Sequence, residues 1–175
     1  MNKLTQLQRD ALKEALKLDG LSIEHKNTLK DILDSNKNNE IIPKLFVDGA
    51  ADLHSKTAGI GGVVYINESE VANFSEPLYD KTNNESEYLS LIKGIQVIHE
   101  LNFGNVLIYS DSELIVKQVT GEYKIKNDRM KKLNDEVKLN LRKLTSWSIE
   151  HVRREKNTRA DELSKLGMEE ARGSK

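Results

Sequence analysis

The chain has 175 residues, no cysteine, and a formal net charge of -1 at pH 7. This length is enough for one domain with an apolar core and a short extension. The composition excludes disulfides and thiolate metal sites and argues against a uniformly basic nucleic-acid binder. The N-terminal residues lack the apolar core of a signal peptide, and no stretch approaches the roughly 18 apolar residues of a membrane span. We therefore expect a soluble, cytoplasmic protein with no membrane partner.

The N-terminal residues predict a helical hairpin. Apolar side chains recur at helical spacing over residues 4–18, where Thr5 and Gln8 are expected to form a capping box. A second helix, capped by Ser22, is predicted to run to about Ser35 and to be followed by a polar linker. Residues 1–40 are thus interpreted as a hairpin extension and linker, which we expect to dock on the main domain or to mediate a protein contact.

The next segment predicts an antiparallel meander of three strands. Leu45, Phe46 and Val47 form an apolar run, which the pair Asp48-Gly49 is expected to close as a turn. The glycines of residues 58–67 indicate a second strand that another backbone approaches closely. A third strand is expected over residues 71–78, ending near Pro77.

The remaining segments alternate between helix and strand. Helices are predicted over residues 84–101, 112–119, 128–144 and 158–168, and strands over residues 106–109 and 147–152. This order is typical of a mixed α/β sheet with helices on both faces. We place the main domain at residues 41–168 and a polar tail at residues 169–175.

Charge is distributed unevenly along the chain. Residues 121–159 carry twelve Lys or Arg against six Asp or Glu, an excess of +6, whereas residues 1–120 carry twelve against eighteen. An anionic partner would therefore prefer the later part of the chain, although a solvated helix face explains the excess equally well.

Four acidic residues fall at the expected ends of strands or starts of helices, and each has an ordinary structural explanation. Asp48 suits a turn, and Glu87 suits a capping box with Asn84. Asp111 suits a helix N-cap, and Asp161 suits the positive end of a helix dipole. Taken singly, none of the four identifies a catalytic site.

Together, the four acids indicate a metal site. Two carboxylates about 4 Å apart repel each other by roughly 4 kcal/mol at an effective dielectric constant of about 20, so a cluster is costly unless cations fill it. Hard oxygen ligands without cysteine or clustered histidine favour Mg²⁺ or Mn²⁺ over zinc.

Four blocks carry a resemblance to a known family: FVDGA (46–50), KTNNESEY (81–88), YSDSELIVKQVTGEY (109–123) and HVRREKNTRADELS (151–164). In this order and spacing the sequence resembles ribonuclease HI over roughly Pro43 to Gly167. The resemblance implies the ribonuclease H-like fold, a five-stranded mixed sheet whose first three strands are antiparallel, flanked by helices. Here a two-helix extension would precede it.

The resemblance also implies an activity, endonucleolytic hydrolysis of the RNA strand of an RNA/DNA hybrid without base sequence preference. Asp48, Glu87, Asp111 and Asp161 match the family's catalytic, metal-binding tetrad. Two Mg²⁺ ions, or Mn²⁺ as a substitute, would yield 5′-phosphate and 3′-hydroxyl ends. Asp48 is expected to bridge both ions, Glu87 and Asp111 to hold one, and Asp161 to help hold the other.

Contacts to nucleic acid are expected from Asn83 and Asn84, which match family asparagines that contact the hybrid backbone. The other expected contacts are Gly49, Lys124, Lys126, Arg153, Arg154 and Asn157.

Two departures from the family pattern affect the expected mechanism. The segment before Asp161 is too short for the loop that carries a mobile catalytic histidine in many members, and we interpret His151 as structural. Arg153, Arg154 or Glu155 would then assist product release or orient the phosphate. Residues 121–128 also leave no room for an extra basic helix.

Two alternatives remain open from the sequence. One is a catalytically silent ribonuclease H-like module that binds nucleic acid or protein, which four intact acids disfavour. The other is a nuclease of the same fold that acts on DNA junctions or structured RNA.

Overall fold

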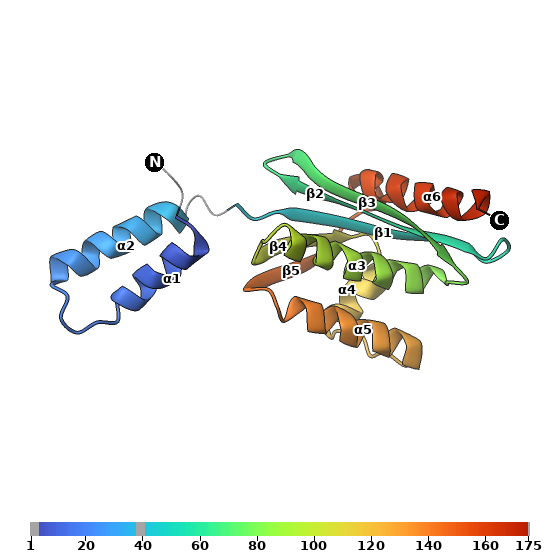
Figure 1. Cartoon of the computed structure of the whole chain (residues 1–175). Coiled ribbons are helices and arrows are strands. Elements are labelled where there is room, and N and C mark those ends of the chain that lie inside the picture. The colour runs from blue at the N-terminus through green and yellow to red at the C-terminus, as the bar shows by residue number, and fades with distance from the viewer. Residues whose placement is uncertain (1–3, 38–40, 175) are drawn as a thin grey trace. The chain divides into compact units, whose positions relative to one another are not determined.

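The computed structural model describes residues 4–37 and 41–174 (Figure 1). The chain forms two compact units, which divide between Ile41 and Ile42. Among the described residues, no helix has both the length and the apolar character needed to cross a membrane.

The N-terminal unit is a pair of helices, α1 (Gln6–Ala15) and α2 (Ile23–Lys37). The predicted capping box of α1 is confirmed, and the Ser22 hydroxyl accepts a hydrogen bond from the His25 N–H at the start of α2 (3.2 Å). Helix α2 runs two residues past the expected end, so only residues 38–40 of the predicted linker lie outside it, and these are outside the described residues. Leu7 and Ile23 are 81% and 79% exposed.

The second unit is built on a five-stranded sheet with the strand order β3-β2-β1-β4-β5. Strands β1 (Lys44–Asp52), β2 (Thr57–Ile66) and β3 (Ser69–Tyr79) form an antiparallel meander. Strand β4 (Asn105–Ser110) pairs in parallel with β1, and β5 (Ser146–His151) pairs in parallel with β4. The predicted mixed sheet and its antiparallel first three strands are confirmed.

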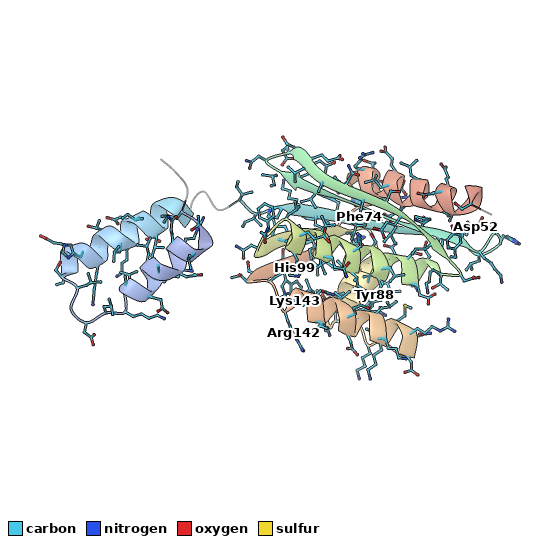
Figure 2. All side chains as sticks on the ribbon, viewed as in Figure 1. Asp52, Phe74, Tyr88, His99, Arg142 and Lys143 are labelled. Carbon is cyan, nitrogen blue, oxygen red and sulfur yellow. The ribbon has the colours of Figure 1, made fainter. Side chains whose placement is uncertain are left out.

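Helices cover both faces of this sheet (Figure 1). Helices α3 (Asn83–Glu100), α4 (Glu113–Thr120) and α5 (Asp128–Leu141) enclose the main apolar core on one face. Helix α6 (Thr158–Gly173) packs on the other face, preceded by the short 3-10 helix η1 (Arg154–Lys156). Tyr88 is fully buried between the core helices (Figure 2). Its hydroxyl donates to Gln118 of α4 (2.8 Å) and accepts from Asn134 of α5 (3.2 Å), which joins the three helices.

The glycines of β2 allow α6 to lie directly on the sheet, as the sequence predicts. A Cβ atom at Gly61 would lie 2.2 Å from the backbone nitrogen of Ser164, and one at Gly59 would lie 2.2 Å from that of Met168. These contacts fix the position of α6, which carries Asp161, over β1 and β2.

Several predicted boundaries are wrong. The pair Asp48-Gly49 does not form a turn, because β1 stays paired with β2 through Asp52 and the chain reverses only after that residue. Strand β3, by contrast, ends at Tyr79, close to its predicted end near Pro77, and an edge strand tolerates this proline because its outer N–H groups need no partner. Helix α6 extends to Gly173 and buries Ala171, so most of the predicted polar tail is helical.

Candidate active site

Two of the predicted acids are placed side by side by the register of adjacent parallel strands. Val47 of β1 pairs with Ser110 of β4, so the next residues, Asp48 and Asp111, follow paired positions. Asp111 is not the cap of α4. That position belongs to Ser112, whose side chain makes no capping hydrogen bond. Asp111 is therefore free of the structural role that its position in the sequence suggests.

Glu87 reaches the same place from helix α3. The helix is opened by a capping box of Thr82 and Glu85, not of Asn84 and Glu87. Its first turns lie close to β1, where a Cβ atom at Gly49 would be 2.3 Å from the Glu87 nitrogen. The Gly49 N–H donates to the Glu87 carboxylate and aims it at the end of the strand.

Asp48, Glu87 and Asp111 form one compact cluster. One carboxylate oxygen from each lies within 4.8 Å of the others. Asp48 and Glu87 are only 6% and 7% exposed, and Glu87 Oε2 is buried with no hydrogen-bond partner. A buried carboxylate oxygen without a partner is costly, so this atom is available to a ligand that the protein itself does not supply.

Asp161 lines the same pocket but differs in its partners. The pocket has a volume of about 270 Å³ and includes all four predicted acids. One carboxylate oxygen of Asp161 accepts from Arg154 (2.6 Å), and the other accepts from Lys165 (2.5 Å). The structure thus groups three acids closely and holds the fourth beside them in two ion pairs.

Electrostatics separate the acids further. Burial, with repulsion from Asp48 and Asp111, raises the pKa of Glu87 to about 9. Burial also raises the pKa of Asp48 to about 6, against the hydrogen bond from Ser164. At Asp161, burial alone would raise the pKa, but the hydrogen bonds from Lys165 and Arg154 outweigh it and lower the pKa. Glu87 therefore keeps its proton near neutral pH unless a cation replaces it.

Polar side chains around the cluster hold it in place. Asp48 accepts a hydrogen bond from the Ser164 hydroxyl of α6. Its backbone N–H donates to the Ser90 hydroxyl (3.2 Å), which donates to the Gly61 carbonyl (2.7 Å). Asn157 donates from Nδ2 to the Val47 carbonyl (3.0 Å) and to Asp111 (3.1 Å). These contacts tie α3, α6 and η1 to the carboxylate end of β1.

Asn157, predicted as a nucleic-acid contact, is 1% exposed and supports Asp111 in this structure. We expect Asn157→Ala to lower the free energy of unfolding by about 1–3 kcal/mol, because the buried Val47 carbonyl loses its side-chain donor. Activity should fall by about 10- to 100-fold as Asp111 loses its orientation. Denaturant unfolding and steady-state kinetics test both effects. Unchanged activity in a folded Asn157→Ala variant would contradict the supporting role.

The other predicted contact residues lie in different surroundings. Asn83 lines the pocket and Gly49 contributes backbone to it, whereas Asn84 is exposed at the start of α3. Arg153 lines a neighbouring pocket. Lys124 and Lys126 are exposed in the segment between α4 and α5.

His151, interpreted from the sequence as structural, is the exposed last residue of β5 and does not line the carboxylate pocket.

Sequence reasoning missed Ser90, Ser164 and Lys165. Their spacing carried a signal, since Ser90 lies three residues after Glu87, and Ser164 and Lys165 lie three and four residues after Asp161. On a helix these intervals place side chains on one face.

The residues present suit hard divalent cations. The cluster offers only carboxylate oxygens, and it leaves one buried oxygen without a protein partner. Mg²⁺ and Mn²⁺ prefer such ligands, whereas zinc sites usually include histidine or cysteine.

Comparison with known proteins assigns the family. The model of the reverse transcriptase-like family matches residues 46–167, a range that contains all four acids of the pocket. This family consists of ribonuclease H-like domains, and the chain belongs to it. Its two N-terminal helices precede the family domain.

Relatives of this ribonuclease H-like chain include archaeal and bacterial proteins. It is 28% identical over 127 residues to Ribonuclease HI of Halobacterium salinarum, covering 72% of this chain and 64% of that protein. It is 30% identical over 126 residues to the bifunctional protein Rv2228c of Mycobacterium tuberculosis, covering 71% of this chain and 35% of that one. The chain thus spans less than two thirds of the length of either relative.

Solved structures of ribonucleases H have the same fold. The crystal structure of RNase H1 from Halobacterium salinarum superposes with a TM-score of 0.71 at 28% identity, covering 74% of this chain and 98% of that one. LC11-RNase H1, solved in complex with an RNA/DNA hybrid, superposes with a TM-score of 0.69 at 29% identity, over 74% and 98% of the two chains.

Proposed function

We propose that this protein is an endoribonuclease that hydrolyses the RNA strand of RNA/DNA hybrids, giving 5′-phosphate and 3′-hydroxyl ends. The observation that carries the proposal is the cluster of Asp48, Glu87 and Asp111, with Asp161 in the same pocket, in a ribonuclease H-like fold. A relative of the same fold binds such a hybrid. A cytoplasmic location stays a prediction from the sequence.

In this proposal the carboxylates hold two Mg²⁺ ions, with Mn²⁺ as a substitute. Asp48, Glu87 and Asp111 would hold one ion, and Asp48 and Asp161 the other. When bound, the ions activate the attacking water and stabilise the leaving 3′ oxygen. Glu87 Oε2 has no competing protein partner, and the Gly49 N–H fixes the orientation of the Glu87 carboxylate. Asn157 does the same for Asp111.

Arg154 and Lys165 have a separate part in the proposed mechanism. Both line the pocket, and both pair with Asp161. An incoming phosphate would compete with the Asp161 carboxylate for the Arg154 and Lys165 side chains. Release from these ion pairs would leave the Asp161 carboxylate available to bind Mg²⁺. The Arg154 side chain is exposed, so it can move from Asp161 to the phosphate. It is our candidate for orienting the scissile phosphate and assisting product release.

We expect Asp161→Asn to reduce cleavage by at least about 100-fold and His151→Ala to leave it within about twofold. Asp161 lines the carboxylate pocket, whereas His151 ends a strand outside it. Initial rates on a labelled hybrid test the pair, with circular dichroism as the folding control. A folded His151→Ala variant without activity would overturn this assignment.

Recognition of the hybrid would rely on its shape and its 2′-hydroxyls, without reading the bases. Lys124 and Lys126 are candidates for phosphate contacts, together with Lys131 and Lys132 at the start of α5. If they contact phosphates, log affinity falls linearly with log salt concentration, and replacing two of them with glutamine flattens the slope by about 1 to 2. Fluorescence anisotropy over a salt series measures the slope; an unchanged slope would remove these lysines from the interface.

A panel of substrates tests the proposal as a whole. A labelled RNA/DNA hybrid is compared with duplex RNA, duplex DNA, a DNA junction and each single strand, in Mg²⁺ and in Mn²⁺. Cleavage confined to the RNA of the hybrid is the expected result. Preference for a junction or structured RNA would indicate a different nuclease of this fold, and binding without cleavage would indicate a silent module.

A further inference from the structure

A second pocket, of about 590 Å³, adjoins the carboxylate pocket. Its lining includes Phe46 of β1, Tyr109 of β4, and the basic residues Lys44, Arg153 and Lys156. Its volume is within the usual range of roughly 300–1,000 Å³ for ligand sites. None of the side chains proposed for catalysis lines it.

The two pockets share their supporting elements. Phe46 lies two residues before Asp48, and Tyr109 lies two residues before Asp111. Residues two apart on a strand point to the same face, roughly 7 Å from each other. At η1, Arg154 lines the carboxylate pocket, whereas Arg153 and Lys156 line the second pocket. A strand of nucleic acid at the carboxylates therefore needs only a short extension to enter the second pocket.

The aromatic pair in the second pocket, Phe46 and Tyr109, lies outside the main apolar cluster. The rings of Phe46 and Tyr109 are stacked, with centroids 4.7 Å apart and an interplanar angle of 23°, and Tyr65 meets Phe46 edge-on at 5.8 Å. All three residues are only half-buried. The main apolar cluster instead uses the alternate residues of these strands, such as Leu45, on the opposite face. The pair thus offers aromatic surface to a ligand.

The charge around this pair suits phosphate. Arg153 and Lys156 are exposed, and neither forms a salt bridge with any residue in the described ranges 4–37 and 41–174. Lys44 is paired with Glu68 at 2.6 Å, and Glu150 is an acid in the pocket lining. Two unpaired cations beside stacked rings, against one acid, are the combination by which proteins hold single-stranded nucleic acid.

We propose that this second pocket binds single-stranded RNA that continues from the strand held at the carboxylates. Bases stack on Phe46 and Tyr109, and Arg153 and Lys156 contact the phosphates. The choice of RNA over DNA rests on the proposed function, which places the RNA strand at the carboxylates. A hybrid whose RNA strand extends beyond the duplex therefore binds more tightly than a blunt one.

Binding is measured by fluorescence anisotropy with the full chain, in chelator to prevent hydrolysis. The probes are a blunt hybrid, hybrids with a six-nucleotide extension at the 5′ or the 3′ end of the RNA or of the DNA strand, and the six-nucleotide RNA alone. We expect one RNA extension to tighten binding about tenfold or more, since stacking contributes roughly 1–3 kcal/mol per base. Tyr109→Leu and Arg153→Gln/Lys156→Gln should each remove most of this gain. Arg142→Gln, which removes an exposed cation beyond α5 on the other face of the sheet, should keep it (Figure 2).

For each variant, the affinity for the extended hybrid is divided by the affinity for the blunt hybrid. This ratio distinguishes loss of the second pocket from a general loss of binding or folding, which would weaken both affinities. Equal affinities for extended and blunt hybrids, a gain that survives both variants, or a gain from DNA extensions alone would each overturn the proposal. The proposed function fails independently, through absence of hybrid cleavage in Mg²⁺ and Mn²⁺. In that case, RNA binding that is lost in Tyr109→Leu would still support the second pocket.

Discussion

Replacing Asp48 with asparagine is expected to lower hybrid cleavage by roughly 10³-fold or more while the protein stays folded. Asp48 belongs to the three-acid cluster, and in our proposal it is the one acid that would help to hold both ions. Loss of metal-based charge stabilisation removes several kcal/mol from transition-state binding, and each 1.36 kcal/mol is a factor of ten in rate. Single-turnover kinetics with saturating enzyme test this without interference from product release.

The same substitution should not weaken the metal-free fold. Asparagine removes the charge whose burial raises the pKa of Asp48 to about 6, and it keeps the size of the side chain. Asp52→Asn is a matched control. Asp52 lies further along the same strand, β1, and pairs with Arg172 outside the cluster (2.8 Å). An Asp48→Asn variant with more than a tenth of the wild-type rate would contradict its role.

Glu87→Gln should abolish cleavage and yet stabilise the metal-free protein at high pH. The pKa of Glu87 is raised to about 9, so the folded state keeps a proton that the unfolded state releases above its ordinary pKa of about 4.5. The folded state binds more protons in this window, and stability therefore falls as pH rises from about 5 to about 9. The loss at the upper end is on the order of a few kcal/mol. Glutamine stays neutral and removes this dependence.

Chemical denaturation at pH 5, 7 and 9 in chelator measures this effect. Glu85→Gln is the control: it lies two residues away on α3, and hydrogen bonds from Thr82 lower its pKa. Its charged form contributes stability above its unfolded pKa, so that substitution should destabilise the protein at neutral pH. Mg²⁺ should restore wild-type stability at pH 9 and have little effect on Glu87→Gln. A wild-type stability that does not change between pH 5 and pH 9 would argue against the buried, protonated Glu87.

The sequence predicted the sheet because its strands carry strong local signals. The continuous apolar run from Val106 to Tyr109 predicted a strand, although in β4 only Val106 and Ile108 of the run are buried. The glycines of β2 anticipated the close approach of α6. The errors arose where local and tertiary preferences conflict. Asp48-Gly49 has the composition of a turn, but antiparallel pairing of both residues with β2 keeps them extended.

The sequence predicted the four carboxylates of the site but not the side chains that hold them in place. Four motifs in order pointed to Asp48, Glu87, Asp111 and Asp161, and the fold brings all four to one pocket. No sequence pattern distinguishes Asn157 as a buried support from Asn157 as a surface contact, because that depends on how η1 packs against β1. The ion pairs of Asp161 likewise depend on the orientation of Arg154, which follows a non-helical segment.

The most direct test of the account is end-group analysis of a hybrid whose RNA strand is labelled, incubated with the full chain in Mg²⁺ or in chelator. We predict internal cleavage of the RNA strand alone, only when the metal is present, with 5′-phosphate and 3′-hydroxyl ends. An intact hybrid in both Mg²⁺ and Mn²⁺, or cleavage that persists in chelator, would contradict the assignment of the carboxylate cluster as a metal-dependent catalytic centre.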